Sequence, residues 1–350
     1  MSASTRVDLA LLGVRGRAPV SRQAGAGPSD DGHLMIDGLS AAIPINDRSP
    51  YLLDEGRVTL DGADIGLDVQ LIDRPQFYDL ETADGISYEK IARLHGQSVL
   101  ATTVVQTCIR YDEADRCRFC AIEASLEAGS TIAVKRPAQI AEVAEAAVRL
   151  DGVTQMVMTT GTSAAKDRGA THLARCVQAV KAVVPDLPIQ VQCEPPGDLA
   201  TLTDLRNAGA DSIGIHVESL DDDVRRRWMP GKSSVTLEEY RAAWREAVRV
   251  FGYNQVSTYL LVGLGEDPDE LVDGARELIA MGVYPFVVPF RPLAGTLASA
   301  DGATAPDAQT LDDITRRVAN ELAVAGMSSS GQRAGCAACG ACSALKSVGA

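Results

Sequence analysis

The sequence lacks any run of about twenty consecutive apolar residues, the length that a helix needs to cross a bilayer. It also lacks an excess of positive charge: 33 lysines and arginines stand against 47 aspartates and glutamates, which gives a net charge of −14. This charge disfavours attraction to nucleic acid or anionic lipid, because the long-range field repels phosphate groups. The apolar stretch near residue 10 is too short for a signal peptide. We therefore expect a cytoplasmic protein with no membrane or nucleic-acid partner.

A disulfide framework is not expected for the eight cysteines, since the cytoplasm keeps thiols reduced. Six of the eight fall into two groups of three, whereas Cys176 and Cys193 stand alone. Groups of three indicate metal binding. Single cysteines in apolar stretches indicate core packing.

Hydrophobic residues make up 46% of the 350 residues, enough for a sizeable core. From residue 99 onward, short β-rich runs alternate with helical patterns, which is typical of repeated βα units around a parallel sheet. Six units predict an α/β fold, a partial (β/α)6 TIM-like barrel over residues 99–327. In such barrels the chemistry lies where the βα loops leave the strands. The predicted strands are 99–107, 154–160, 188–193, 212–217, 255–262 and 284–290, and the predicted helices are 137–150, 171–184, 198–208, 235–251, 268–281 and 306–325.

The two ends of the chain lack this rhythm. Residues 1–98 predict an irregular α+β N-terminal cap, with one helix over 87–95. Residues 328–350 are rich in Gly, Ala and Ser apart from their cysteines. We expect this tail to fold only around a metal.

The segment TCIRYDEADRCRFC places Cys108, Cys117 and Cys120 directly after the first predicted strand, with the spacing C-x8-C-x2-C. Three thiolates on one loop can bind three corners of a [4Fe-4S] cubane and leave the fourth iron open for substrate. Zinc is the main alternative, but three cysteines without a nearby histidine fill a tetrahedral zinc site poorly.

This loop resembles the cluster loop of the radical S-adenosylmethionine (SAM) superfamily, in which an aromatic residue precedes the last cysteine, as Phe119 does. The usual spacing there is C-x3-C-x2-C, so this loop is five residues longer. The likeness covers roughly residues 99–300. It is closest to the biotin synthase and lipoyl synthase branch and, more narrowly, to radical enzymes encoded beside a bacterial nitrilase. It implies that SAM chelates the open iron and is cleaved to a 5′-deoxyadenosyl radical, which takes a hydrogen from a small-molecule substrate.

The resemblance also implies SAM-binding residues at the strand ends: an edge for the methionyl amine, backbone close to the adenine, polar groups for the ribose or methionyl part, and an anion clamp. A structural or surface role is the alternative for each. The edge for the methionyl amine is formed by Thr159, Thr160, Gly161 and Thr162, and the backbone close to the adenine belongs to Gly263 and Gly265. The polar groups for the ribose or methionyl part are Glu194, His216 and Glu218, and the anion clamp is Arg291.

The tail segment GCAACGACS places Cys336, Cys339 and Cys342 at the spacing C-x2-C-x2-C, with small residues that let the backbone wrap a cubane closely. We predict an auxiliary [4Fe-4S] cluster. A zinc site or a disordered redox tail is the alternative. The fourth ligand stays open between Ser343, a distant residue and the substrate.

Three functions follow as hypotheses. The first is radical sulfur insertion, as in biotin and lipoyl synthases. The second is oxidation or rearrangement of a nitrogen-containing metabolite linked to nitrile metabolism. The third, of another class, is a non-catalytic iron–sulfur electron carrier or redox sensor. An enzyme would need a low-potential donor, flavodoxin or ferredoxin, and the arginines predicted to dock it are Arg110, Arg116, Arg118, Arg225, Arg226 and Arg227. The alternative is that these arginines are ordinary solvated charges or pair with Asp112, Glu113, Asp221, Asp222 and Asp223.

Overall fold

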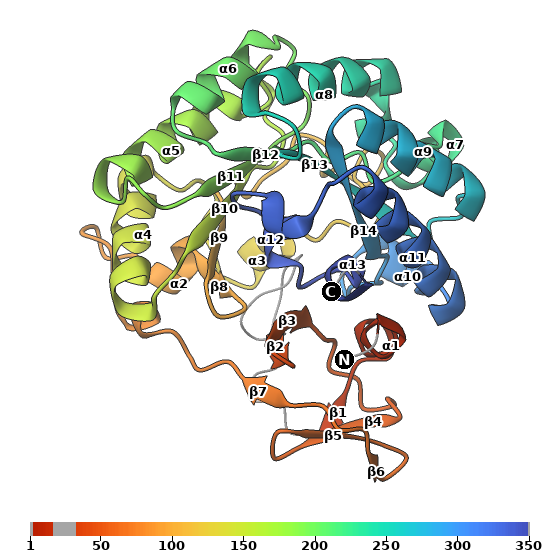
Figure 1. Ribbon diagram of the computed structural model, residues 1–350. Coiled ribbons are helices and arrows are strands. Elements are labelled where there is room, and N and C mark those ends of the chain that lie inside the picture. The colour runs from red at the N-terminus through yellow and green to blue at the C-terminus, as the bar shows by residue number, and fades with distance from the viewer. Residues whose placement is uncertain (1–2, 17–32, 349–350) are drawn as a thin grey trace.

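A curled sheet forms the centre of the computed structural model, which describes residues 3–16 and 33–348, and helices cover its outer side (Figure 1). The strand order is β14-β13-β12-β11-β10-β9-β8. Strands β9 to β14 run parallel, and β8 pairs antiparallel with β9 at the edge. The predicted partial (β/α)6 barrel is confirmed, with one antiparallel edge strand added. The strands are β8 (Arg93–His95), β9 (Val99–Thr103), β10 (Gln155–Thr159), β11 (Ile189–Gln192), β12 (Ser212–Gly214), β13 (Val256–Val262) and β14 (Val283–Pro289).

One barrel helix begins at a signal visible in the sequence. Before the helix at residue 237, Thr236 Oγ1 accepts a hydrogen bond from the Glu239 N–H, and the Glu239 carboxylate accepts one from the Thr236 N–H, which is a capping box. That helix buries Trp244 completely against the sheet. No helix in the described residues combines the length and apolarity needed to cross a membrane. The barrel helices are α3 (Ala124–Glu127), α4 (Pro137–Asp151), α5 (Ala170–Val183), α6 (Ala200–Asn207), α7 (Asp222–Trp228), η3 (Lys232–Ser234), α8 (Leu237–Phe251), α9 (Pro268–Ala280), α10 (Leu297–Ala300) and α11 (Ala308–Val324).

The N-terminal residues form a helix and two small sheets, with strand orders β1-β4-β5-β6 and β3-β2-β7. The single helix predicted over 87–95 is wrong. Only one turn forms there, and the chain then extends as β8, whose pairing covers the edge of β9. The elements are α1 (Ala3–Leu12), β1 (Arg15–Gly16), β2 (His33–Ile36), β3 (Leu39–Ala42), β4 (Tyr51–Asp54), β5 (Arg57–Leu60), β6 (Ala63–Asp64), β7 (Val69–Leu71), η2 (Gln76–Asp79) and α2 (Tyr88–Ile91).

The C-terminal tail, with η4 (Ser329–Gly331), α12 (Cys336–Cys339) and α13 (Leu345–Val348), lies across the beginnings of the barrel strands. Polar side chains at three strand starts hold its backbone: Gln155 Oε1 accepts from the Gly335 N–H, Ser212 Oγ donates to the Ala334 carbonyl, and Gln255 Nε2 donates to the Gly331 carbonyl. The tail therefore has protein contacts of its own in addition to its cysteines. We call this end of the barrel the base and the opposite end, where the strands finish, the mouth.

Helix α12 lies inside the curve of the sheet, and α1 packs against α13, so both ends of the chain meet below the base (Figure 1). The Ala42 N–H at the end of β3 donates to the Ala341 carbonyl across 2.9 Å. The N-terminal segment and the tail thus close the base together.

Candidate functional site

The first cysteine group lies at the mouth, on the loop that follows β9. Its backbone turns twice: the Tyr111 N–H donates to the Cys108 carbonyl across 3.0 Å, and the Cys120 N–H donates to the Cys117 carbonyl across 2.9 Å. All three thiols are partly buried. The loop therefore presents Cys108, Cys117 and Cys120 at the end of a parallel strand, as the sequence predicts.

The three mouth thiols influence one another electrostatically. Burial raises the pKa of Cys120 to about 11, and the Cys108 thiolate adds to this rise. Burial raises the pKa of Cys117 well above its usual value, with Lys232 opposing and Cys120 reinforcing that shift. Three thiols this close repel one another when ionised, so a cation must hold them as thiolates.

No three His, Cys, Asp or Glu side chains in residues 3–16 and 33–348 converge closely enough to hold one metal ion. A zinc ion needs its ligand atoms within about 2.0–2.3 Å of one point. A cubane binds each thiolate through a different iron atom, so the ligating sulfurs lie farther apart than they do around a single zinc ion.

One wall of the mouth is the segment 159–162, which leaves β10 and docks on the cysteine loop. The Gly161 N–H donates to the Val105 carbonyl, and the Thr162 carbonyl accepts from the Ile109 N–H. A Cβ at Gly161 would lie 2.0 Å from the Thr107 carbonyl oxygen. Glycine is thus required at this position because two backbones meet there.

Glu194, two residues beyond β11, lies in a network that sequence reasoning missed. Its carboxylate accepts from Arg110 Nε and Nη2 across 3.2 and 3.1 Å and from Thr162 Oγ1 across 2.8 Å. Arg168 Nη1 lies 3.8 Å away. The Arg110 and Glu194 side chains are 15% and 8% exposed, so water screens the pair little. Arg110 is therefore an internal partner of Glu194 and not a docking arginine.

Glu218, beyond β12, pairs with Lys232 across 2.5 Å. Burial lowers the pKa of Lys232, but the surrounding negative groups, Glu218 first, raise it by more, so the ammonium stays charged. Lys232 in turn lowers the pKa of Cys117 and Cys120. No spacing in the sequence pointed to Lys232, because it reaches the mouth from the excursion between β12 and α8.

His216 lies deeper, with its ring stacked on Tyr259 at a centroid separation of 4.0 Å and an interplanar angle of 10°. Its Nδ1 accepts from the Tyr259 N–H, so Nε2 carries the hydrogen. Nε2 is buried and has no hydrogen-bond partner in the part of the chain that the structure describes. Burial lowers the pKa of His216 to about 3, so the ring is neutral.

The turn after β13 contains Gly263 and Gly265, both with positive φ. The Glu266 carboxylate closes the turn by accepting from the Gly263 and Leu264 N–H groups, each across 3.0 Å. A Cβ at Gly263 would meet Pro306, whereas nothing lies within 4 Å of one at Gly265. Only Gly265 therefore leaves its backbone open to a ligand.

An apolar cluster packs beside this turn and includes two members of the cysteine loop, Cys117 and Phe119. Its buried members are Val224, Trp228, Met229, Leu264, Phe290 and Ala298. Arg291 directly follows Phe290 and lies two residues beyond the end of β14.

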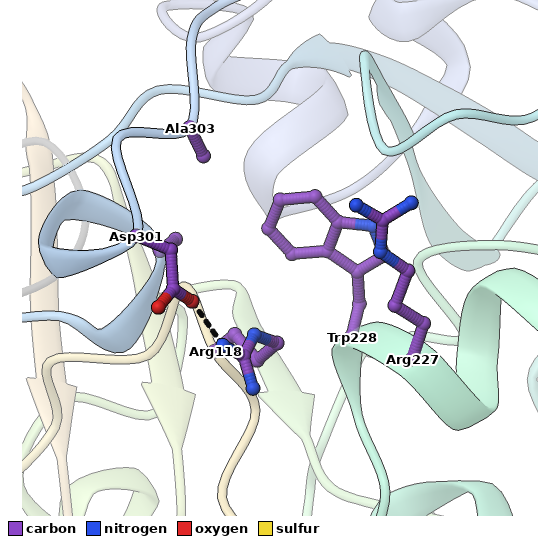
Figure 2. Close-up of a pocket in the computed structure, with 6 residues that line it drawn as sticks. Arg118, Arg227, Trp228, Asp301 and Ala303 are labelled. Atoms are coloured by element: carbon purple, nitrogen blue, oxygen red, sulfur yellow. Dashed lines mark hydrogen bonds and ion pairs between the residues drawn. The ribbon is translucent and has the colours of Figure 1, made fainter.

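A pocket of about 350 Å³ opens next to the cysteine loop and is lined by Arg118, Arg227, Trp228, Ala298, Asp301 and Ala303. Figure 2 shows Arg118 paired with Asp301 on one side and the Arg227 guanidinium over the Trp228 indole on the other. The pocket lies at the surface of the mouth.

The six arginines predicted to dock an electron donor do not form one surface. Arg225 is 1% exposed and bonds Asp222 and the Val235 carbonyl, so together with Arg110 it belongs to the interior. Arg226 pairs with Asp223. The prediction is wrong for Arg110 and Arg225 because both side chains are buried and bond groups inside the protein, so neither can contact an electron donor.

The second cysteine group lies at the base. Cys336 and Cys339 bound the single turn of α12, and Gly340 follows with φ 74°, which turns the chain toward Cys342. Cys336 Sγ accepts hydrogen bonds from Tyr259 Oη across 2.9 Å and from Gln192 Nε2 across 3.1 Å. Burial raises the pKa of Cys336, and these two donors lower it. Donors aimed at sulfur fit a site that holds a thiolate, as a cluster requires.

Cys176 and Cys193, the two single cysteines, are 0% and 7% exposed within the core. Burial raises the pKa of each to about 12. Both therefore stay protonated core residues, in agreement with the expectation.

Comparison with known proteins gives a consistent result. Residues 114–278 match the Radical SAM superfamily model, which takes in Cys117 and Cys120 and begins after Cys108. The chain is 28% identical over 140 residues to the bacteriochlorophyllide c C-7(1)-hydroxylase of Chlorobaculum limnaeum, covering 39% of this chain and 34% of that protein. It is 30% identical over 201 residues to the chloroplastic lipoyl synthase of Chlamydomonas reinhardtii, covering 55% and 43%.

Among solved structures, methylornithine synthase matches with a TM-score of 0.50 and 17% identity over 72% of each chain, which supports the fold alone. A lipoyl synthase of Thermus thermophilus is 26% identical over 176 residues, 48% of this chain and 50% of that one. The alignments with these three curated relatives span half of each relative's length or less.

Proposed function

The chain belongs to the radical SAM superfamily, and we propose that it is an enzyme that cleaves SAM at a [4Fe-4S] cluster held by Cys108, Cys117 and Cys120. The observation that carries the proposal is the cysteine loop, which follows β9 at the mouth and brings three thiols within electrostatic reach of one another. When bound, the cluster supplies the electron that splits SAM into methionine and a 5′-deoxyadenosyl radical, which removes a substrate hydrogen.

We assign the walls of the mouth to SAM. Residues Thr159 to Thr162 form the edge for the methionyl amine, and Arg291 faces the methionyl carboxylate. Arg110 and Lys232 fix the orientation of Glu194 and Glu218, so both carboxylates are available to hydrogen-bond the ribose or methionyl group. Phe119 and Gly265 form the adenine side, where the apolar cluster and an unobstructed backbone meet.

The interior of the barrel between mouth and base offers neutral hydrogen-bonding groups to a small-molecule substrate or to SAM. The His216 Nε2–H lies beside Gly214 and the Gln192 side chain. A buried donor without a partner is costly, so a ligand acceptor at this point stabilises the complex. We assign the His216 Nε2–H as the donor to that ligand acceptor.

An auxiliary cluster on Cys336, Cys339 and Cys342 would face the same interior through Tyr259 and Gln192. This placement, together with the lipoyl synthases among the relatives, supports sulfur insertion as the reaction. Radical oxidation or rearrangement of a nitrogen-containing metabolite remains the alternative reaction, and a non-catalytic electron carrier the alternative of another class. The reductant of the mouth cluster is a flavodoxin or ferredoxin.

The test is anaerobic reconstitution with iron and sulfide, followed by SAM and dithionite and quantification of 5′-deoxyadenosine. The protein is expected to hold about eight irons, and about four after Cys336, Cys339 and Cys342 are changed to Ala. Changing Cys108, Cys117 or Cys120 to Ala abolishes 5′-deoxyadenosine, whereas Cys176→Ala retains it. Iron-loaded protein that forms none would favour the electron carrier instead.

A further inference from the structure

We propose that Arg6 is a positioning residue for an anionic iron–sulfur cluster at the base, with its Nη1 group donating a hydrogen bond to that cluster. The inference rests on the auxiliary cluster proposed above. It gives the N-terminal helix a role in the base site, because Arg6 belongs to α1.

Arg6 is buried to 2% exposure, and most of its donors are used to hold the tail. Nε donates to the Ser343 carbonyl across 3.1 Å, and Nη2 donates to the Gly340 and Ser40 carbonyls, each across 2.7 Å. Two of these three acceptors belong to the cysteine segment. Arg6 is therefore fixed against the loop that carries Cys339 and Cys342.

The remaining group, Nη1, is buried and has no hydrogen-bond partner among the described residues. A buried guanidinium N–H without an acceptor is costly, so this group is a donor available to a ligand at the base. Burial lowers the pKa of Arg6 to about 10, and Cys342 and Cys339 oppose that shift, which places both thiols close to the cation.

No carboxylate of the described residues pairs with Arg6. The second cation of the base, Lys346, also donates to a backbone carbonyl, that of Ala338, across 3.0 Å. At the mouth, by contrast, Glu194 and Glu218 pair with Arg110 and Lys232. Within residues 3–16 and 33–348, these two cations of the base thus have no carboxylate partner, whereas the two cations of the mouth are paired.

Unpaired buried charge is stabilised only by a counter-charge. Three thiolates that ligate a [4Fe-4S] core leave the assembly with net negative charge, opposite in sign to the charges of Arg6 and Lys346. Tyr259 and Gln192 donate to Cys336 from the barrel interior, whereas Arg6 approaches Cys339 and Cys342 from below the base. The site is therefore neutral and hydrogen-bonding toward the interior, and cationic toward the N-terminal segment.

The test uses the full chain with Cys108, Cys117 and Cys120 changed to Ala, so that all bound iron belongs to the base. In this parent protein, Arg6→Gln removes the charge and keeps an amide donor for the tail. We expect its cluster to be harder to reduce by about tenfold in the equilibrium constant, about 59 mV for a one-electron couple. Arg6→Lys keeps the charge and should retain the parent potential and iron content. Arg245→Gln on the exposed side of α8 is the charge-matched control.

A folded Arg6→Gln protein with the parent potential and iron content would overturn the role of Arg6. If the Arg6→Gln variant does not fold, the Arg6→Lys variant tests the proposal instead. A folded Arg6→Lys protein that binds no iron would also overturn the role of Arg6. Failure of the underlying cluster looks different: iron content would then be unaffected when Cys336, Cys339 and Cys342 are changed in the otherwise intact chain. Iron analysis and potentiometry give both answers without an activity assay.

Discussion

The hydroxyl of Tyr259 donates a hydrogen bond to Cys336 Sγ across 2.9 Å, while its ring stacks on His216. One side chain thus touches both a ligand candidate at the base and the polar group assigned to a ligand in the barrel interior. Hydrogen bonds to ligating sulfur raise the reduction potential of iron–sulfur clusters because they offset negative charge.

Tyr259→Phe keeps the stacked ring and removes only this donor. We expect the base cluster to become harder to reduce by roughly threefold to tenfold in the equilibrium constant, with a loss of about 1 kcal/mol in unfolding free energy. Potentiometry in the protein without mouth cysteines measures the first effect. The control is Tyr253→Phe, which removes an exposed hydroxyl that bonds the Ala325 carbonyl. An unchanged potential in Tyr259→Phe would show that this bond does not act on a cluster.

His216 makes the metal-free protein sensitive to acid. Burial and, to a smaller extent, Lys232 lower the pKa of His216 to about 3, whereas a histidine in the unfolded chain has a pKa of about 6.5. Between these values only the unfolded chain binds the proton, so stability falls as the pH drops from about 6.5 toward 3. From pH 7 to pH 5 this contribution amounts to about 2 kcal/mol.

We expect His216→Phe, which keeps a ring on Tyr259, to lose about 2 kcal/mol less than the unchanged chain between these two pH values. Urea denaturation at pH 7 and pH 5 measures the difference. Equal losses in both proteins would mean that His216 is not held neutral in the fold.

The buried Arg110–Glu194 pair predicts strong non-additivity. Arg110→Met leaves a carboxylate that is 8% exposed, with a hydrogen bond from Thr162 Oγ1 and with Arg168 at 3.8 Å as its cation, and we expect a cost of about 3–5 kcal/mol in unfolding free energy. Arg110→Met combined with Glu194→Gln should recover most of that cost. The matched control is the exposed Arg241–Glu277 pair, for which Arg241→Met should cost less than about 1 kcal/mol. Additive single-residue losses at Arg110 and Glu194 would contradict the coupling.

The barrel could be predicted from the sequence because strand and helix periods are local properties. Both groups of three cysteines could be predicted for the same reason, since the members of each group lie close together in the sequence. Arg6 could not be found in this way, because its acceptor at Gly340 is 334 residues away and no pattern links α1 to the tail. Tyr259 and Lys232 likewise acquire their roles only when distant loops meet.

The sequence did not reveal the surroundings of the three arginines of α7. Arg225, Arg226 and Arg227 are adjacent in the sequence, yet the helix turns by about 100° per residue, so they face different surroundings. Arg225 enters the interior, Arg226 pairs with Asp223, and Arg227 lies over Trp228. Which face a short helix buries depends on its tertiary partner, and a charge run alone does not reveal it.

Because the three arginines of α7 differ in their surroundings, only some of them can contact an electron donor. Flavodoxins and ferredoxins are acidic, and a chain of net charge −14 repels them at long range, so local cations must favour the encounter near the mouth. Arg118 is paired with Asp301, whereas Arg227 is exposed and has no ion pair in the described part of the chain, and it lines the pocket beside the cysteine loop (Figure 2). Changing all three arginines of α7 to Glu would disrupt the fold through Arg225.

Arg227→Glu alone is therefore the informative change. We expect flavodoxin-driven formation of 5′-deoxyadenosine to slow by about threefold at low salt and by less at high salt, because salt screens exposed charges. Dithionite-driven formation should change little, since dithionite needs no docking surface. Arg245→Glu on the outer helix α8 makes the same change in net charge and should leave both rates nearly unaltered. Equal slowing by the two variants would mean that net charge, and not the surface around Arg227, controls the encounter with the donor.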